Sequence, residues 1–457
     1  MAVSPARAAA FEILQRVERE QSYAGELLHS ARFNRLSSAD HGLATELVMG
    51  VLRWRSWLDQ LLAEASSQNV ERLDKEVLSA LRLGAYQLKF LSRVPARAAI
   101  FESVELVKAA RKRSAASFVN AVLRKTAGTG AAASAEPAAD IFIQIEKSSD
   151  AIALACNSAH PDWLVARWVE RYGIETTRQI CVADQHPPQT CVRVYDRQCL
   201  DELAREGVTL GPNRLLSAAQ IVLAGDITRT RAYRQGRVAV QDAGSQLVAL
   251  LVGQGKTILD CCAAPGGKTI LLSRQNPTAL VIASELHPHR ARLLRDLVCL
   301  PNVRIVAGDA RQFPFSRSFD RILADVPCSG TGTLARNPEI KWRLRTEDLD
   351  DLQARQIAIV KSALGQLAAG GRLVYSTCSM EREENEAVVE AALHELSEFS
   401  IVDCRTELDR LRQEGDLLMY GIETLLDGPY LRTTPGLHAC DGFFAAIVQR
   451  KSLEKSQ

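Results

Sequence analysis

The sequence predicts an α/β domain with a parallel sheet in its second half, preceded by an all-helical domain and a small α+β segment. In the first third, apolar residues recur at three- and four-residue spacing, which is typical of amphipathic helices. From about residue 236, short apolar strands alternate with longer amphipathic helices, and this alternation indicates a parallel sheet covered on both faces. Ligands of such sheets bind at the carboxyl ends of the strands, where the most informative motifs of this chain also lie.

Composition places the chain among ordinary globular proteins. It has 457 residues, of which 47% are hydrophobic and 24% charged, enough for two or three domains. We expect a cytoplasmic protein, because no apolar run approaches the ~20 residues that span a bilayer and the N-terminus lacks a signal-peptide core. The eleven cysteines form no CxxC pair, so we expect free thiols and no metal site.

Residues 1–126 are predicted to form the helical domain. Ala10, Ile13, Leu14 and Val17 mark one amphipathic face. This part of the chain carries 19 Lys and Arg against 13 Asp and Glu, whereas the remainder is slightly acidic. A basic surface suits an RNA backbone, and a solvated helical surface explains the same charge equally well.

Two further segments separate this domain from the parallel sheet. Residues 127–140 are small and low in complexity, as in a flexible linker. Residues 141–235 are predicted to form the small α+β segment, with strands at Thr190–Val194 and Ile221–Leu223 and a helix at Leu200–Glu206. The α/β domain then covers residues 236–452, and its predicted strands are Thr257–Cys261, Leu280–Ser284, Val303–Val306, Arg321–Ala324 and Arg372–Tyr375.

The first of these strands runs into a glycine-rich turn and then a helix. Glycine lets a backbone approach a ligand closely. A P-loop requires glycine where this chain has Cys262, and the dinucleotide pattern GxGxxG is also absent. The turn is therefore a candidate cofactor site of another kind, made of Cys262, Ala263, Ala264, Pro265, Gly266, Gly267 and Lys268.

Two acidic residues follow the next two strands. Glu285 comes directly after the second strand, where a carboxylate can bind the ribose hydroxyls of a nucleoside cofactor. Asp309 follows the third strand and could accept a hydrogen bond from an adenine amino group. Taken alone, Asp309 is equally well explained as a turn or helix cap.

The last two strands end in cysteine-containing loops. Asp325 and Cys328 stand at the end of the fourth strand, ahead of a Ser-Gly-x-Gly loop. A carboxyl group there could bind the Watson–Crick edge of a flipped cytosine. Cys378 ends the fifth strand, flanked by hydroxyl residues and followed by an acidic helix start. A thiol in this setting can have a lowered pKa and act as a nucleophile.

Together these motifs resemble the RNA cytosine-C5 methyltransferases of the Nop2/Sun group, which have a Rossmann-like, S-adenosylmethionine-dependent domain. The similar motifs are AAPGGKT, ADVPCSGTGT, YSTCS and the C-terminal Asp441–Ala445. The N-terminal helices resemble a NusB-like RNA-binding domain, and this pairing is typical of the RsmB-type 16S rRNA methyltransferases of bacteria. Two departures are the Cys261-Cys262 pair before the turn and Glu285 where aspartate is frequent.

The resemblance implies methylation of carbon 5 of a specific cytosine in 16S rRNA, of the cytosine(967) type. It makes Cys378 the nucleophile that adds to C6, places Asp325 at N3 and at the cofactor boundary, and gives Cys328 a part in releasing the product. S-adenosyl-L-methionine is the implied cofactor, and 16S rRNA, free or in an assembling subunit, is the implied partner. We expect a monomer without a membrane partner.

Three alternatives stay open at this point. The same chemistry could act on tRNA. DNA-type cytosine methylation would use Cys328 as the nucleophile, although the second strand-end cysteine, Cys378, argues against it. A NusB-like RNA-binding assembly factor with an inactive domain is disfavoured because Asp325 and both cysteines are intact.

Overall fold

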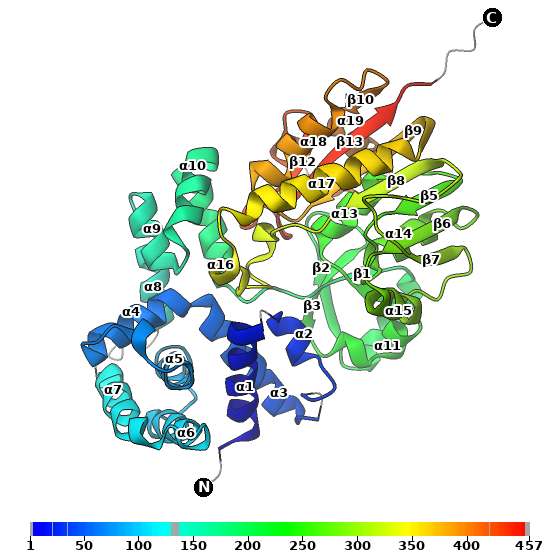
Figure 1. Cartoon of the computed structure of the whole chain (residues 1–457). Helices are drawn as coiled ribbons and strands as arrows, with labels where there is room; N and C mark the ends of the chain where they lie inside the picture. Colours follow the sequence, from blue (N-terminus) through cyan, green and yellow to red (C-terminus); the bar gives the residue numbers. More distant parts are fainter. Residues whose placement is uncertain (1–2, 21, 34, 129–136, 420, 453–457) are drawn as a thin grey trace, which may run out of the picture. The chain divides into compact units, whose positions relative to one another are not determined.

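The computed structural model describes residues 3–20, 22–33, 35–128, 137–419 and 421–452. The chain forms two compact units (Figure 1): Met1–Pro187 with Leu334–Arg343, and Pro188–Thr333 with Leu344–Gln457. Most of the predicted linker at 127–140 lies outside the described residues, between the end of α7 at Gly128 and the start of α8 at Pro137. Within the described ranges, no helix is long and apolar enough to cross a membrane.

The first unit is helical, as the apolar spacing predicts. Ser37 caps α3 by accepting a hydrogen bond from the Asp40 amide at 3.1 Å. Helices α3 and α5 pack closely at Gly50, where an added Cβ would lie 2.0 Å from the Tyr86 ring. The longer helices are α1 (Pro5–Glu20), α3 (Ser38–Arg53), α4 (Arg55–Ser66), α5 (Lys75–Phe90), α6 (Ala96–Ala109), α7 (Ala116–Gly128), α8 (Pro137–Glu146), α9 (Ala151–Ser158) and α10 (Asp162–Gln185), with the short α2 (Ala24–Leu28).

A distant piece of chain completes this unit. The segment Leu334–Arg343 follows directly on the Cys328 loop in sequence, and it contains the short helix α16 (Ile340–Arg343). The Lys341 side chain is buried, and its Nζ donates to the carbonyl oxygens of Arg53 and Ala159, each at 2.9 Å. These bonds satisfy two backbone carbonyls inside the helical unit, so the segment folds as part of it.

The second unit begins with a small antiparallel sheet in the order β2-β3-β1-β4. Its buried core contains Val192, Leu203 and Val238. The α+β prediction is confirmed for this part of the chain, whereas residues 141–187 of the predicted segment 141–235 belong to the helical first unit. Strands β2 and β4 are ones that the sequence pattern did not reveal. The elements are β1 (Cys191–Val194), α11 (Leu200–Arg205), β2 (Thr209–Pro212), β3 (Ala219–Ala224), α12 (Arg231–Arg234) and β4 (Val238–Val240).

The large sheet of the second unit has the strand order β11-β12-β13-β9-β8-β5-β6-β7, with β10 paired to β13. The five predicted strands run parallel, as expected, but β13 is antiparallel to β9. The sheet is therefore mixed, with a C-terminal antiparallel edge. Its strands are β5 (Thr257–Asp260), β6 (Leu280–Glu285), β7 (Val303–Ala307), β8 (Phe319–Asp325), β9 (Leu367–Thr377), β10 (Phe399–Val402), β11 (Leu426–Asp427), β12 (Tyr430–Thr433) and β13 (Phe443–Arg450).

Helices cover both faces of this sheet (Figure 1). Alternate strand residues point to opposite sides: Val374 of β9 joins one core, whereas Leu373 and Tyr375 join the other. One core is completed by α13 (Ala243–Leu251), α14 (Gly267–Gln275), α15 (Pro288–Leu297) and α19 (Cys404–Gln413), and the other by α17 (Asp348–Gly365) and α18 (Glu386–Leu393). In this three-layer arrangement, the helices cover the two faces of the sheet, and the carboxyl ends of the parallel strands stay free to bind ligands.

Replacing Lys341 with methionine tests the inserted segment. Methionine fills the site but donates no hydrogen bond, so the carbonyls of Arg53 and Ala159 lose their donor. We expect a loss of about 2–4 kcal/mol in the free energy of unfolding, measured by chemical denaturation followed by helical circular dichroism. The exposed Lys147→Met is the control and should change stability by less than ~0.5 kcal/mol. Equal stability of the two variants would contradict the anchoring role.

Candidate active site

The two cysteine loops meet because β8 and β9 are parallel neighbours. Asp325 of β8 is paired in register with Ser376 of β9. Cys328 follows three residues after Asp325, and Cys378 two residues after Ser376. Their sulfur atoms lie 3.4 Å apart, although 50 positions separate them in the sequence. Both thiols are partly exposed, so a substrate can reach them.

Backbone contacts hold the two loops together. The Gly332 amide donates to the Cys378 carbonyl at 2.9 Å, and the Met380 amide donates to Thr331 Oγ1 at 2.8 Å. A Cβ on Gly332 would lie 2.3 Å from the Gly442 carbonyl oxygen, so only glycine fits there. Gly442 belongs to the Asp441–Ala445 motif, which thus packs directly behind the Cys328 loop.

The Cys328 thiol is held in its protonated form. The hydrogen bond with Cys378 raises the pKa of Cys328 well above its ordinary value, and burial raises it further. A thiol with a raised pKa keeps its proton at neutral pH. Cys328 is therefore suited to donate a hydrogen bond or proton to a group beside it.

Asp325 stands between the cysteine pair and the cofactor turn. Its Oδ2 pairs with Lys268 Nζ at 2.8 Å, and its Oδ1 accepts from Ser376 Oγ at 2.7 Å. Burial would lower the pKa of Lys268, but the charge and hydrogen bond of Asp325 raise it, with Cys378 contributing. The Lys268 ammonium also lies 5.2 Å from the Phe443 ring centroid. A fixed cation thus stands beside the carboxylate and near the sulfurs.

The predicted turn is built around one obligatory glycine. Gly266 has φ of 114°, and a Cβ there would lie 2.5 Å from Val298. The Ala263 amide donates to the Ser284 carbonyl at 2.8 Å, which ties the turn to the end of β6. Thr269 Oγ1 donates to Asp260 Oδ2 at 2.7 Å. Burial raises the pKa of Asp260 to about 7, and the Thr269 hydrogen bond opposes this rise.

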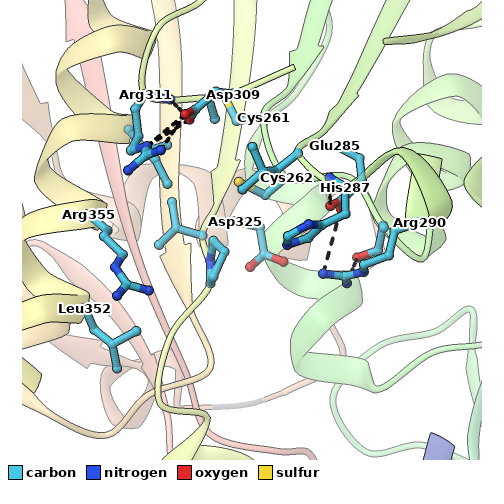
Figure 2. A pocket seen from close by; sticks show the side chains of 16 residues that line it. Cys261, Cys262, Glu285, His287, Arg290, Asp309, Arg311, Asp325, Leu352 and Arg355 are labelled. Carbon is cyan, nitrogen blue, oxygen red and sulfur yellow. Dashed lines mark hydrogen bonds and ion pairs between the residues drawn. The ribbon is translucent and has the colours of Figure 1, made fainter. Parts of the chain in front are cut away.

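A pocket of about 630 Å³ opens beside this turn, within the ~300–1,000 Å³ range of small-molecule sites (Figure 2). In Figure 2, Leu352 and Arg355 enter it from α17, across from Glu285, His287 and Arg290. Its walls combine carboxylates, arginines and apolar side chains: Cys261, Cys262, Ala264, Glu285, Leu286, His287, Arg290, Asp309, Ala310, Arg311, Asp325, Val326, Pro327, Leu352, Arg355 and Ile359.

The polar groups of the pocket fit a nucleoside. Glu285 is buried, and its Oε1 accepts from the His287 amide at 3.0 Å, with Arg290 3.9 Å from Oε2. A carboxylate has four acceptor sites, so Glu285 retains capacity for a ribose diol. Hydrogen bonds from Arg311 lower the pKa of Asp309, which stays ionised as an acceptor. Apolar side chains between these carboxylates suit a flat base.

The structure brings most of the predicted residues together. Cys262, Ala264, Glu285, Asp309 and Asp325 line the pocket, and Lys268 pairs with Asp325. Ala263, Pro265, Gly266 and Gly267 shape the turn without lining the pocket. Cys328 and Cys378 lie beyond Asp325, outside the pocket lining.

Sequence reasoning missed several residues of the site. Asp260 and Ser376 stand within the motifs that were singled out, so proximity to a strand end could have identified them. Glu384 was noted only as part of an acidic helix start, yet it is fully buried and bonded to both cysteine loops. No sequence signal distinguishes it from its acidic neighbours. Arg355 lines the pocket from a helix that was predicted without a functional role.

Three family models match the chain. Residues 247–449 match the model of the 16S rRNA methyltransferase RsmB/F, residues 4–128 the NusB family, and residues 160–226 an RsmF/B-like ferredoxin-like domain. Among solved structures, a protein titled PH0851 has a TM-score of 0.75 at 21% identity, over 98% of this chain and 99% of its own. NSun6 from Pyrococcus horikoshii has a TM-score of 0.54 at 19% identity, over 64% of this chain and 99% of its own. At these identities, the likeness concerns the fold alone.

Curated relatives match over nearly the full length. The probable ribosomal RNA small subunit methyltransferase B of Bacillus subtilis is 34% identical, over 97% of this chain and 98% of its own. The ribosomal RNA small subunit methyltransferase B of Escherichia coli O1:K1 is 30% identical, over 91% and 92%. With the geometry above, these matches show that the chain belongs to the ribosomal RNA small subunit methyltransferase B family of S-adenosyl-L-methionine-dependent methyltransferases.

Proposed function

We propose that the protein methylates carbon 5 of a specific cytosine in 16S rRNA, at the cytosine(967)-type site, through a covalent bond between Cys378 and C6. The observation that carries this proposal is the pair of thiols 3.4 Å apart at the ends of adjacent strands, next to Asp325 and the cofactor pocket. The names of the relatives supply the RNA class.

Cys378 and Asp325 activate the cytosine. The C5 carbon of cytosine is a poor nucleophile, and addition of the Cys378 thiolate to C6 moves the C5–C6 double-bond electrons onto C5 and the ring. Asp325, as the carboxylic acid, donates a hydrogen bond or its proton to N3, where negative charge develops. Lys268, paired with Asp325 at 2.8 Å, keeps that carboxyl group in place. When bound, S-adenosyl-L-methionine supplies an electrophilic methyl group.

Cys328 serves the release of the product. A base takes up the C5 proton, and the electrons of the C5–H bond re-form the C5–C6 double bond. The C6–sulfur bond then breaks, and its electron pair returns to Cys378 Sγ. Cys328 keeps its proton because its pKa is raised, and its sulfur lies 3.4 Å from the leaving sulfur. A hydrogen bond from Cys328 therefore stabilises the departing thiolate.

The cofactor is assigned to the pocket beside the turn. In this proposal, Glu285 would hold the ribose hydroxyls and Asp309 the adenine amino group, and the turn from Cys262 to Lys268 would contact the rest of the cofactor. Asp325 stands at the boundary between the cofactor and the target base. Burial and ion pairing fix these carboxylates before the ligand arrives, which reduces the entropy lost on binding.

The remaining domains are assigned to RNA. We assign residues 1–126 and the segment 141–235 to binding the rRNA around the target cytosine. The base leaves its stack to reach Cys378 and Asp325. The basic excess of the first 126 residues fits a phosphate backbone. In this proposal the protein acts as a monomer in the cytoplasm.

Exchanging each cysteine separately tests the assigned roles. With labelled S-adenosyl-L-methionine and small-subunit rRNA, Cys378→Ala should lose methyl transfer, because no thiolate adds to C6. Cys328→Ala should accumulate a covalent protein–RNA adduct, visible as a shifted band on a denaturing gel, because release is impaired.

Cys299→Ala, at an exposed thiol away from the site, is the control and should behave as wild type. An active Cys378→Ala together with an inactive Cys328→Ala would reverse the roles and favour the DNA-type mechanism. A wild-type protein that methylates tRNA and not rRNA would overturn the substrate.

Glu285→Gln tests the cofactor assignment. The amide presents donors where the ribose hydroxyls need an acceptor, so affinity for S-adenosylhomocysteine should fall about tenfold, equivalent to ~1.4 kcal/mol. Isothermal titration calorimetry measures this change without RNA. The exposed Glu398→Gln is the matched control, and equal dissociation constants for the two variants would place the ribose elsewhere.

A further inference from the structure

One buried carboxylate joins both cysteine loops. Glu384 lies in the short 3-10 helix Arg382–Glu384 and has no exposed surface. Its Oε1 accepts from the Ser329 amide at 2.8 Å, directly after Cys328. Its Oε2 accepts from the Ser379 hydroxyl at 2.5 Å, directly after Cys378, and from the Ser329 hydroxyl.

The same carboxylate also fixes the covering helix. Gln356 of α17 donates its side-chain amide to Glu384 Oε1 at 2.9 Å and to the Pro327 carbonyl at 3.0 Å. The Tyr375 hydroxyl donates to the backbone carbonyl of Glu384. Three segments far apart in sequence therefore converge on one residue: the Cys328 loop, the Cys378 loop and α17.

Two partners of the side chain, the Ser329 amide and the Gln356 side-chain amide, can only donate, so Oε1 has to accept from both. The hydroxyls of Ser329 and Ser379 donate to Oε2 and also contact each other at 3.0 Å. A neutral amide at this position would turn both hydroxyls from donors into acceptors. A buried charge is expensive unless it is fully hydrogen-bonded, and Glu384 meets this condition. The cost of burying it points to a role beyond packing.

We propose that Glu384 is the positioning residue of this active site: by binding Ser329 and Ser379 at once, it keeps the sulfurs of Cys328 and Cys378 in the register that adduct formation and release require. The catalytic consequence rests on the proposed covalent mechanism, whereas the positioning itself does not. Glu384 acts through the two cysteines and does not need to touch the substrate.

The charge of Glu384 also acts on Cys328. The hydrogen bond with Cys378 and burial are the main causes of the raised pKa of Cys328, and the nearby negative charge of Glu384 adds to them. Removing that charge should make the Cys328 thiol easier to ionise. A residue that only fills space, without a charge near Cys328, would not produce this effect.

Glu384→Gln is the test, with Glu407→Gln as control. Glu407 is also buried and charged, but it pairs with Arg372 and Arg410 on another part of the unit, each at 2.7 Å. For Glu384→Gln we expect kcat of methyl transfer to fall about tenfold or more with KM for RNA unchanged, since small misplacements of reacting groups have large rate effects. The pH profile of Cys328 alkylation by iodoacetamide, followed by peptide mass spectrometry, should move to lower pH.

Glu407→Gln should leave both readouts as in wild type. The proposal is overturned if Glu384→Gln also leaves both unchanged. If Glu384→Gln does not fold, Ser379→Ala is the second variant, because it removes one hydrogen bond to Glu384 and keeps the charge of Glu384. We expect Ser379→Ala to lower kcat and to leave the pH profile of Cys328 alkylation unchanged. An unchanged kcat would likewise overturn the proposal. The alkylation profile is measured without RNA, so it tests the positioning role independently of the covalent mechanism. If the wild-type protein forms no covalent adduct with RNA, the covalent mechanism is refuted, and the alkylation result still decides the positioning role.

Discussion

The register between β8 and β9 determines where every reactive group of this protein stands. Asp325 pairs with Ser376 across the two strands, and the loops that follow carry Cys328 and Cys378 to within 3.4 Å of each other. Because strand side chains alternate between faces, a shift of one residue would send one cysteine to the other side of the sheet. The buried strand residues on both faces prevent that shift, so the hydrophobic cores and the chemistry depend on the same alignment.

Around this alignment, charges are arranged in pairs. Lys268 pairs with Asp325, Arg311 binds Asp309, and Glu384 accepts from the amides of Ser329 and Gln356. Each carboxyl group is thereby oriented at a place where the protein partly excludes water, and interactions with a developing charge are stronger there than in solution. The raised pKa of Cys328 follows from the same closeness of groups.

Much of this arrangement was predictable from the sequence, because parallel strands and the ligand-binding residues at their carboxyl ends form recognisable patterns in short stretches of sequence. The apolar strands, the turn from Cys262 to Lys268 and the strand-end residues Glu285, Asp325 and Cys378 are all contiguous patterns. The features that the sequence did not predict depend on contacts between segments far apart in the chain. The antiparallel position of β13, the burial of Lys341 in the helical unit and the choice of Glu384 among several acidic neighbours have no local signature.

The covalent mechanism requires that the sulfur of Cys378 bond to the target base. Small-subunit rRNA containing 5-fluorocytidine tests it most directly, because fluorine at C5 cannot leave as a proton and the methylated adduct is trapped. Digestion and mass spectrometry of the trapped wild-type complex then locate the nucleotide on one peptide. We predict that the peptide containing Cys378 carries the nucleotide; a nucleotide attached to Cys328 would contradict the role of Cys378 as nucleophile.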